Sequence, residues 1–466
     1  MVDTVRQLAA LQALLADNAT HLISPQDLRD FLVSAVPTGR SATKVVTHPA
    51  ASDIRKAQAD YSGGGADINA AIAALPKRTV GGFPAGTSPY GEVAFTEGDF
   101  DFASKLSLNI PGMTVALRGC GPPNFAQLLG ATTLNFALPA TDDCVLVDNN
   151  AVILLRNLAI VGDGVNTRDT LVVGTEAHSG IYENLLFAGA VRHGLYEPPG
   201  VNNVHSNSNN NFTNLYAREL GKAFHTHGFG NTYHALRALR STLSPSAGTG
   251  EAMNLGGLGS RFFGVITEEH ETGMLLDGDS QRCSYHGVML NGAMQDDHIV
   301  GLKIDGANSF NIFGLEIFGG AKTGGGAGLV VADALVGAIY GLVSHGSASG
   351  KGVDVQGNSE ITFFNPVIGE ATPWVATTNL TRIFGYAGWA RNQANILSGT
   401  TSIDVTHGVV GSATFGYQQI MVCPINSLGN ATKWWVSNQT ATGFRINVDV
   451  DPGASQAQFV WWVGNI

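Results

Sequence analysis

Apolar positions recur along most of the chain in short runs of strand length. A typical run places one apolar residue before Asn or Gly and another after it, as in Leu155–Leu158, Tyr182–Leu185 and Tyr285–Val288. The small central residues stand at positions 157, 184, 214, 235, 264, 287, 314, 341 and 365, and the eight intervals average 26 residues. A fixed period of this size is typical of a repeat architecture.

A second register of small and acidic residues follows the same period. Asp277, Asp305 and Asp333 each follow an apolar residue, spaced 28 residues apart. Three strands of about five residues and three short turns fill roughly 21–27 residues, which is one coil of a parallel β-helix. Leucine-rich repeats would show L-x-x-L-x-L, and a propeller blade would need about 40–50 residues. We therefore predict a mainly β protein, with a right-handed single-stranded parallel β-helix over 63–395.

The N-terminal segment has a different pattern. Apolar residues lie there at helical spacing, at Val5, Leu8, Leu11 and Leu15 and again at Leu28, Phe31 and Leu32. Ser24-Pro25 supplies an N-cap and a first-turn proline for the second run. These short helices could pack on the main domain or bind a partner. We interpret 1–45 as a helical attachment segment and 46–62 as a linker.

The repeat stops near residue 395, and the remainder alternates between strands and turns. We expect a small β-sandwich over 396–466, serving as a trimerisation or glycan-binding tip. Its predicted strands are Thr401–His407, Gln419–Pro424, Lys433–Ser437, Phe444–Val450 and Gln458–Val463.

Composition narrows the class of protein. Charged residues make up only 14% of 466 residues, against an average of about 25%. The net charge of −11 lacks the basic footprint of a nucleic-acid-binding protein. No apolar run is long enough to span a bilayer, and the N-terminus lacks the pattern of a signal peptide. The four cysteines are scattered, so we expect buried thiols, with no metal site and no cofactor.

Residues 63–125 resemble the opening of the pectate-lyase-like superfamily of right-handed β-helices. The likeness rests on a helix at Asp67–Leu75, the run Gly91–Phe95 and the segment Met113–Gly121, which follows the form G-V-x-L-x-G-x-G. Where the superfamily usually has Pro-x-Gly after the strand, this chain reads Thr96-Glu97-Gly98.

Both ends of the chain resemble phage tail proteins. Ile23–Leu32 is similar to a short element near the N-terminus of many of them, and Ser427–Asn438 is similar to small β-domains that end tailspikes and fibres. The resemblance implies a homotrimer that attaches to other phage tail proteins through residues 1–45. It also implies a protein made in the host cytoplasm that acts on the virion tail, where it recognises a host surface glycan.

An acidic cluster offers groups for glycoside hydrolysis, which needs two carboxyl groups. Glu268, Glu269 and Glu271 follow the strand Phe262–Ile266, and Asp296 and Asp297 follow one coil later. Crowded carboxylates raise one another's pKa, as an acid–base pair requires. The alternative is a solvated acidic rim.

Elimination would instead use a Tyr or His base, with Arg neutralising a sugar carboxylate. One local set is Arg282, Tyr285 and His286, and another is His225, His227, Arg237 and Arg240. The histidines could equally stack between coils. The asparagines at 202, 203, 207 and 209–211 could form a binding loop or a ladder between coils.

Trp434 and Trp435 could stack on sugar rings. Adjacent strand residues face opposite ways, so at most one of the two is exposed. We take Trp434, Trp435, Arg282 and Tyr285 as ligand-binding candidates.

Three functions stay open at this point. The first is a phage tailspike or fibre that recognises host polysaccharide, either with or without depolymerase activity that degrades it by hydrolysis or elimination. The second is a structural or receptor-binding fibre without catalysis. The third is a cellular polysaccharide lyase or hydrolase.

Overall fold

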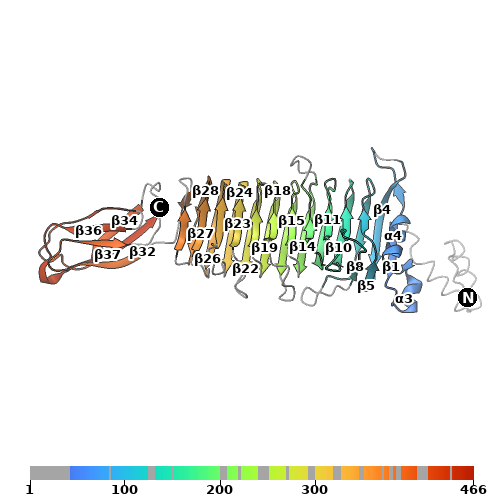
Figure 1. Ribbon diagram of the computed structural model, residues 1–466, viewed down its shortest axis with the longest axis horizontal. Coiled ribbons are helices and arrows are strands. Elements are labelled where there is room, and N and C mark those ends of the chain that lie inside the picture. Colours follow the sequence, from blue (N-terminus) through green and yellow to red (C-terminus); the bar gives the residue numbers. More distant parts are fainter. Residues whose placement is uncertain are drawn as a thin grey trace, which may run out of the picture.

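The structure is a computed structural model that describes residues 42–82, 85–123, 132–149, 151–199, 207–218, 222–239, 251–268, 272–291, 300–318, 327–345, 351–369, 372–376, 381–384, 390–406, 418–440 and 443–465. Its main body is a parallel β-solenoid drawn as a rod in Figure 1. The predicted parallel β-helix is thus confirmed, while the trimer stays a prediction.

One side of the solenoid is an 11-stranded parallel sheet. Its strands, in spatial order, are β6 (Leu106–Leu108), β9 (Val145–Val147), β11 (Asp169–Val173), β13 (His193–Tyr196), β15 (Lys222–Thr226), β17 (Glu251–Leu255), β20 (Thr272–Leu276), β23 (Val300–Asp305), β25 (Leu329–Ala332), β27 (Lys351–Gln356) and β30 (Thr372–Ala376). Each of these strands comes from a different coil, so hydrogen-bonded neighbours in this sheet are one full repeat apart in sequence.

The remaining solenoid strands belong to a bent 20-stranded sheet. They are β1 (Thr43–Thr47), β2 (Tyr61–Ser62), β3 (Lys77–Arg78), β4 (Ser88–Phe95), β5 (Gly98–Phe102), β7 (Thr114–Arg118), β8 (Thr132–Phe136), β10 (Val152–Val161), β12 (Ile181–Ala188), β14 (Asn211–Arg218), β16 (Thr232–Leu239), β18 (Gly257–Leu258), β19 (Arg261–Glu268), β21 (Ser280–Gln281), β22 (Ser284–Asn291), β24 (Asn308–Phe318), β26 (Leu335–His345), β28 (Ile361–Phe364), β29 (Val367–Ile368) and β31 (Thr381–Phe384).

The repeated Asn, Gly or Ala marks the bend within these strands. All nine repeat positions have positive φ, from 52° at Asn365 to 70° at Gly314. The bend reverses the alternation of side chains, so Tyr182 and Leu185, three residues apart, both face the core. Where the residue is Asn, its amide bonds the neighbouring coil: Asn184 Nδ2 donates to Asn157 Oδ1 over 2.9 Å. Asn and Gly recur here because both tolerate the left-handed region.

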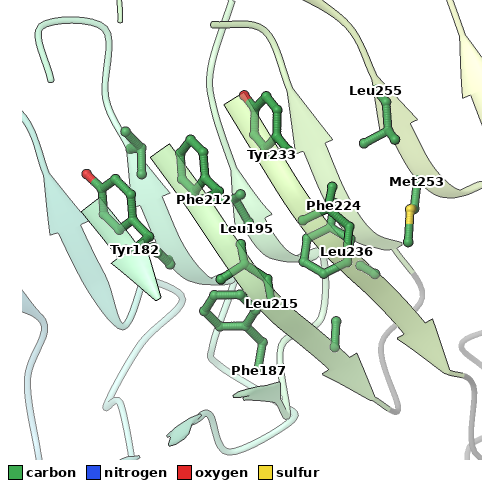
Figure 2. Packing of buried hydrophobic residues seen from close by; sticks show 14 of the residues in the cluster. Tyr182, Phe187, Leu195, Phe212, Leu215, Phe224, Tyr233, Leu236, Met253 and Leu255 are labelled. Carbon is green, nitrogen blue, oxygen red and sulfur yellow. The ribbon is translucent and has the colours of Figure 1, made fainter. Parts of the chain in front are cut away.

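Stacked aromatic rings fill the core next to this bend. Tyr182, Phe212, Tyr233, Phe262 and Tyr285 form an inner ladder with ring centroids 4.5–4.8 Å apart, part of which is visible in Figure 2. The spacing matches the distance between hydrogen-bonded strands, so each ring stacks on its equivalent in the next coil.

The first coil begins earlier than the sequence suggested. Residues 46–62, predicted to be a linker, contain the end of β1, helix α3 (Asp53–Gln58) and β2, and β1 pairs with both β2 and β4. Helix α4 (Gly65–Ala73) buries Ile68, Ala71 and Ile72 and lies at this end of the rod (Figure 1). The predicted helices of 1–36 lie outside the described residues.

The C-terminal strands form two three-stranded antiparallel sheets. One contains β32 (Ala390–Ile396), β37 (Ala457–Asn465) and β34 (Gln418–Pro424), and the other β33 (Ser402–Thr406), β36 (Gly443–Val448) and β35 (Trp434–Ser437). Trp434 packs edge-on against Phe459, and Phe444 against Trp461, so the sheets share one core. A short 3-10 helix, Gly453–Ser455, precedes β37. All five predicted strands are present, and β32 is additional.

The prediction of buried cysteines is correct for two of the four. Cys144 and Cys283 are buried free thiols as predicted, but Cys120 and Cys423 are exposed, because Cys120 lies in a turn and Cys423 on an outer sheet face.

Within the described ranges, none of the helices has the length and apolar character needed to cross a bilayer.

Candidate functional site

A cavity of about 420 Å³ opens on the outer face of the 11-stranded sheet, over β9, β11 and β13. Its floor is an in-register row of Leu146, Val172 and Tyr196. Because strand residues alternate, their neighbours Leu171 and Leu195 point into the core. The turns that precede the strands add charged side chains at the cavity's edge, and we call this region the groove.

Two arginines one repeat apart, Arg168 and Arg192, line the groove. Arg168 binds Asp143 through two hydrogen bonds, Nε–Oδ1 at 2.8 Å and Nη2–Oδ2 at 2.6 Å. Arg192 binds Asp169 in the same bidentate manner. The aspartates hold the guanidinium groups in fixed orientations, while the arginine side chains remain 44% and 40% exposed.

His193 and Tyr196 stand beside these pairs on β13. His193 Nδ1 lies 2.9 Å from Asp169 Oδ1, and the His193 ring stacks on Tyr196 with centroids 4.9 Å apart. Arg192 also lies over the Tyr196 ring, 4.4 Å from its centroid.

Burial and hydrogen bonding set the protonation of these groups. Burial lowers the pKa of His193 in spite of the nearby Asp169 carboxylate, so its imidazole is neutral near pH 7. Burial also raises the pKa of Tyr196, which keeps its phenol protonated. Burial alone would raise the pKa of Asp169, but hydrogen bonds from His193 and Arg192 outweigh it and lower that pKa.

A second pair of histidines continues from this cluster into the next coil. His225 is the register neighbour of Tyr196, and its ring centroid lies 5.3 Å from that of Tyr196 and 5.1 Å from that of His193. Nε2 of His225 lies 2.5 Å from Nε2 of His227. Burial, reinforced by the nearby His227, lowers the pKa of His225 to about 3.

Directly behind Tyr196, inside the solenoid, lies the fully buried carboxyl of Glu197. It accepts hydrogen bonds from Tyr233 Oη at 2.5 Å and Asn231 Nδ2 at 2.9 Å. Burial raises its pKa to about 7, against the opposing effect of these donors. Glu197 faces away from the groove and therefore belongs to the wall that supports it.

The predicted acidic cluster is only partly described. Glu268, at the end of β19, pairs with Arg237 at 2.5 Å on the outside of the bent sheet. Glu269, Glu271, Asp296 and Asp297 lie outside the described residues, as do Arg240, Asn202 and Asn203. Their catalytic role stays a prediction.

The other predicted residues do not come together at one site. Arg282 is an exposed turn residue with φ 55°, whereas Tyr285 is buried in the inner ladder and its hydroxyl donates to the Leu255 carbonyl. A ligand cannot reach Tyr285 there. His286 stacks between Phe263 and Phe313, as the stacking alternative expected. Asn207 and Asn210 are likewise buried and bond neighbouring coils.

The tryptophan pair is arranged as predicted. Trp435 is 47% exposed on the outer face of β35, and Trp434 is turned toward the sandwich core. Asn447 and Ser402 share the outer face with Trp435 in register.

Sequence reasoning missed Arg168, Asp169, Arg192, His193 and Tyr196. A signal existed, because Arg168-Asp169 and Arg192-His193 are 24 residues apart, close to the repeat period, and each pair enters a strand of the 11-stranded sheet. Within the described part of the chain, no cluster of three or more His, Cys, Asp or Glu is arranged to hold a metal ion.

No protein-family model matches the chain, and no curated protein sequence does. Among solved structures, the tailspike protein gp49 from Pseudomonas phage LKA1 is 13% identical with a TM-score of 0.38, over 81% of this chain and 68% of that one. Pectate lyase Pel9A is 14% identical with a TM-score of 0.38, over 74% of this chain and 82% of that one. The tailspike gp49 from Acinetobacter baumannii bacteriophage Fri1, a capsular polysaccharide depolymerase, is 10% identical with a TM-score of 0.29, over 80% and 79%. The function of this chain has to be inferred from its own side chains.

Proposed function

We propose that this chain is a phage tail protein of the tailspike type that binds an anionic host-surface polysaccharide in the groove and cleaves it by β-elimination. The observation that carries the proposal is the grouping of two oriented arginines and a protonated tyrosine at one cavity, with the neutral His193 stacked on that tyrosine.

The arginines fit a sugar carboxylate. Each guanidinium has five N–H donors, and its aspartate uses two of them. The free Nη1 groups of Arg168 and Arg192 can therefore receive a uronate. Neutralising a carboxylate makes the adjacent C–H more acidic, which is the difficult step of elimination.

Tyr196 and His193 supply the proton transfers. The neutral imidazole of His193 takes the proton next to the carboxylate, and the electron pair of that C–H bond forms the new C=C bond. The glycosidic C–O bond breaks, and the Tyr196 phenol protonates the departing oxygen.

Hydrolysis is the weaker alternative at this groove. It needs one protonated carboxyl as general acid, whereas Asp143 and Asp169 are both bound by arginines and the pKa of Asp169 is lowered. The acidic cluster of Glu268, Glu269, Glu271, Asp296 and Asp297 remains the hydrolytic hypothesis.

The exposed Trp435 favours a second, recognition role for the C-terminal sandwich. An indole presents a flat apolar face suited to the C–H groups of a sugar ring, and Asn447 beside it offers an amide. We propose that this face binds the same polysaccharide without cleaving it.

The proposed assembly is a homotrimer on the virion tail, joined to other tail proteins through residues 1–45. The repeat rod and the small terminal sandwich support this arrangement. Light scattering of the purified chain tests it: a trimer supports the tail protein, and a monomer favours a cellular lyase.

The activity test is a digest of purified host-envelope polysaccharides in which reducing ends and the ultraviolet absorbance of unsaturated sugars are followed together. We expect both signals to rise, and both to fall strongly in Arg168→Gln and Arg192→Gln. Arg282→Gln, a matched exposed arginine outside the groove, should behave like wild type. Reducing ends without absorbance would overturn elimination in favour of hydrolysis, and binding without either signal would indicate a non-catalytic fibre.

A further inference from the structure

The two sheets of the C-terminal sandwich have outer faces of different chemistry. On the sheet of β33, β36 and β35, Trp435 lies among polar groups, and Arg445 forms an ion pair with Asp404 of the neighbouring strand. On the sheet of β32, β37 and β34, the three strands contain no aspartate or glutamate, and Arg391 is their only charged residue. The two faces therefore suit different partners.

The outer side of the second sheet is apolar along its edge strand β34 and its central strand β37. Met421 and Cys423 alternate on β34 with Val422, which packs against the sandwich core, so both point outward. On β37, Trp462 lies in register with Met421, and Val460 lies in register with Cys423. We call Met421, Cys423, Val460 and Trp462 the apolar face.

Several apolar side chains here are open to solvent. Met421 is 55% exposed, and Cys423 is an exposed free thiol. Ile425 continues the pairing of β34 by donating its N–H to the Gln458 carbonyl, and its side chain is 46% exposed. A contiguous group of exposed apolar side chains is typical of a contact surface.

The charge of the chain indicates what can cover the apolar face. With 37 acidic and 26 basic residues, the chain carries a net charge of −11, so copies of it repel one another at long range. Strands without aspartate or glutamate are a place where two copies can meet without opposing carboxylates. A glycan is less suited, because its hydroxyl groups would give up water for the thioether of Met421 and the isopropyl group of Val460.

We propose that the apolar face is a contact between copies of this chain, with Cys423 and Trp462 buried in it. The inference rests on the proposed homotrimer and adds where its subunits meet. Gln393, exposed on β32 and in register with Val460, supplies an amide for the polar rim of such a contact. Trp435 belongs to the opposite sheet and stays open to the polysaccharide.

The native cysteines test the contact without any substitution. When the oligomer is treated with a water-soluble maleimide and its peptides are analysed by mass spectrometry, we expect Cys120 of the solenoid to react and Cys423 to be protected. Both are exposed in the single chain, whereas Cys144 and Cys283 are buried and should react only after unfolding in urea. An oligomer in which Cys423 reacts as fast as Cys120 would overturn the inference, whether the face is bare or reserved for another tail protein.

A charge placed on the apolar face tests the same contact through the oligomeric state. Met421→Glu adds one carboxylate per subunit, and we expect the concentration at which the trimer dissociates to rise by about 10²-fold or more, since like charges meet across the contact. Thr406→Glu, at an exposed strand position of the other sheet, is the matched control and should dissociate like the wild type.

Sedimentation velocity over a dilution series measures both variants, and circular dichroism shows whether each is folded. Equal dissociation of the two folded variants would overturn the contact and leave the proposed trimer intact. A wild-type chain that is monomeric would overturn the proposed trimer and the contact together. If Met421→Glu fails to fold, protection of Cys423 in the unmodified protein decides the question.

Discussion

The coils that form the groove have two faces with opposite organisation. Inside, Tyr182, Phe212 and Tyr233 repeat one kind of side chain, and each ring stacks on the next at 4.7 Å. Outside, the in-register neighbours Tyr196 and His225 differ from coil to coil. Repetition stabilises a stack because each ring needs a like neighbour, whereas a reaction needs unlike groups close together. The inner face therefore specifies the fold, and departures from repetition on the outer face carry the chemistry.

Repetition on the outer face serves packing too. An outer ladder of stacked rings runs along the bent sheet with centroids 4.6–4.8 Å apart, through His234, Phe263, His286, Phe313, Tyr340 and Phe364. Its ring faces contact one another, so only edges are exposed and a sugar cannot stack on them. This row contrasts with Trp435, for which the described residues supply no stacked ring.

The largest expected effect comes from the groove. Tyr196→Phe keeps the ring that stacks on His193 and removes only the proton donor. We expect kcat to fall by about 10²–10⁴-fold, with the midpoint of thermal unfolding unchanged. Tyr340→Phe, on the outer ladder, is the matched control and should retain full activity. Equal activities of the two variants would remove Tyr196 from the mechanism.

The two ladders should differ in their contribution to stability. Phe262→Ala leaves a cavity in the core and should lower the free energy of unfolding by about 3–5 kcal/mol. Phe313→Ala, at a position 39% exposed, should cost only about 1 kcal/mol. Urea unfolding followed by circular dichroism measures both, and a larger loss for Phe313→Ala would contradict the assignment of the core.

Buried Glu197 should make stability depend on pH. Its pKa is raised from 4.5 to about 7, so the folded state binds more protons than the unfolded state between these values. Stability is therefore greatest below pH 4.5 and falls as the pH rises through that window. Glu197→Gln cannot ionise and should be more stable than wild type at pH 8 by about 3 kcal/mol, with little difference at pH 4.

The control for this experiment is Glu183→Gln, which removes an outer carboxylate paired with Arg156. Urea unfolding at both pH values should show no comparable gain at pH 8. If Glu197→Gln were destabilising at both pH values, the Glu197 carboxyl would be ionised in the folded protein, and its ionised form would stabilise the fold.

The smallest effect is expected at the sandwich. Trp435→Ala should weaken binding of the intact polysaccharide by about 5-fold, since one stacking contact contributes about 1 kcal/mol. Met421→Ala, 55% exposed on the other sheet, serves as the control. Isothermal titration measures both, and equal affinities would leave the sandwich without a glycan-binding role.

The sequence predicted the repeats that run through the whole solenoid and missed the contacts between particular coils. The nine Asn, Gly and Ala positions identified the repeat, and the structure shows the reason that they recur, since each coil needs a left-handed residue at its strand bend. The pairing of Arg192 with Asp169 could not be predicted in the same way. These residues belong to different coils, and the contact depends on a register that only the folded solenoid defines.

Tyr285 shows the opposite failure. Its neighbours Arg282 and His286 suggested a binding cluster, but the three side chains point in different directions around the coil. Tyr285 occupies the same repeat position as Tyr182, and both side chains are buried in the core. The repeat pattern therefore indicated a core residue at this position and not a ligand-binding residue.

The central claim is that the groove holds the polysaccharide, and a crystal structure of Tyr196→Phe with an oligosaccharide of the cleaved polymer tests it most directly. We predict a sugar carboxylate within hydrogen-bond distance of the Nη1 groups of Arg168 and Arg192, with the departing glycosidic oxygen close to Tyr196 Oη. An oligosaccharide bound only at Trp435 or at the acidic cluster, with the groove empty, would contradict the account.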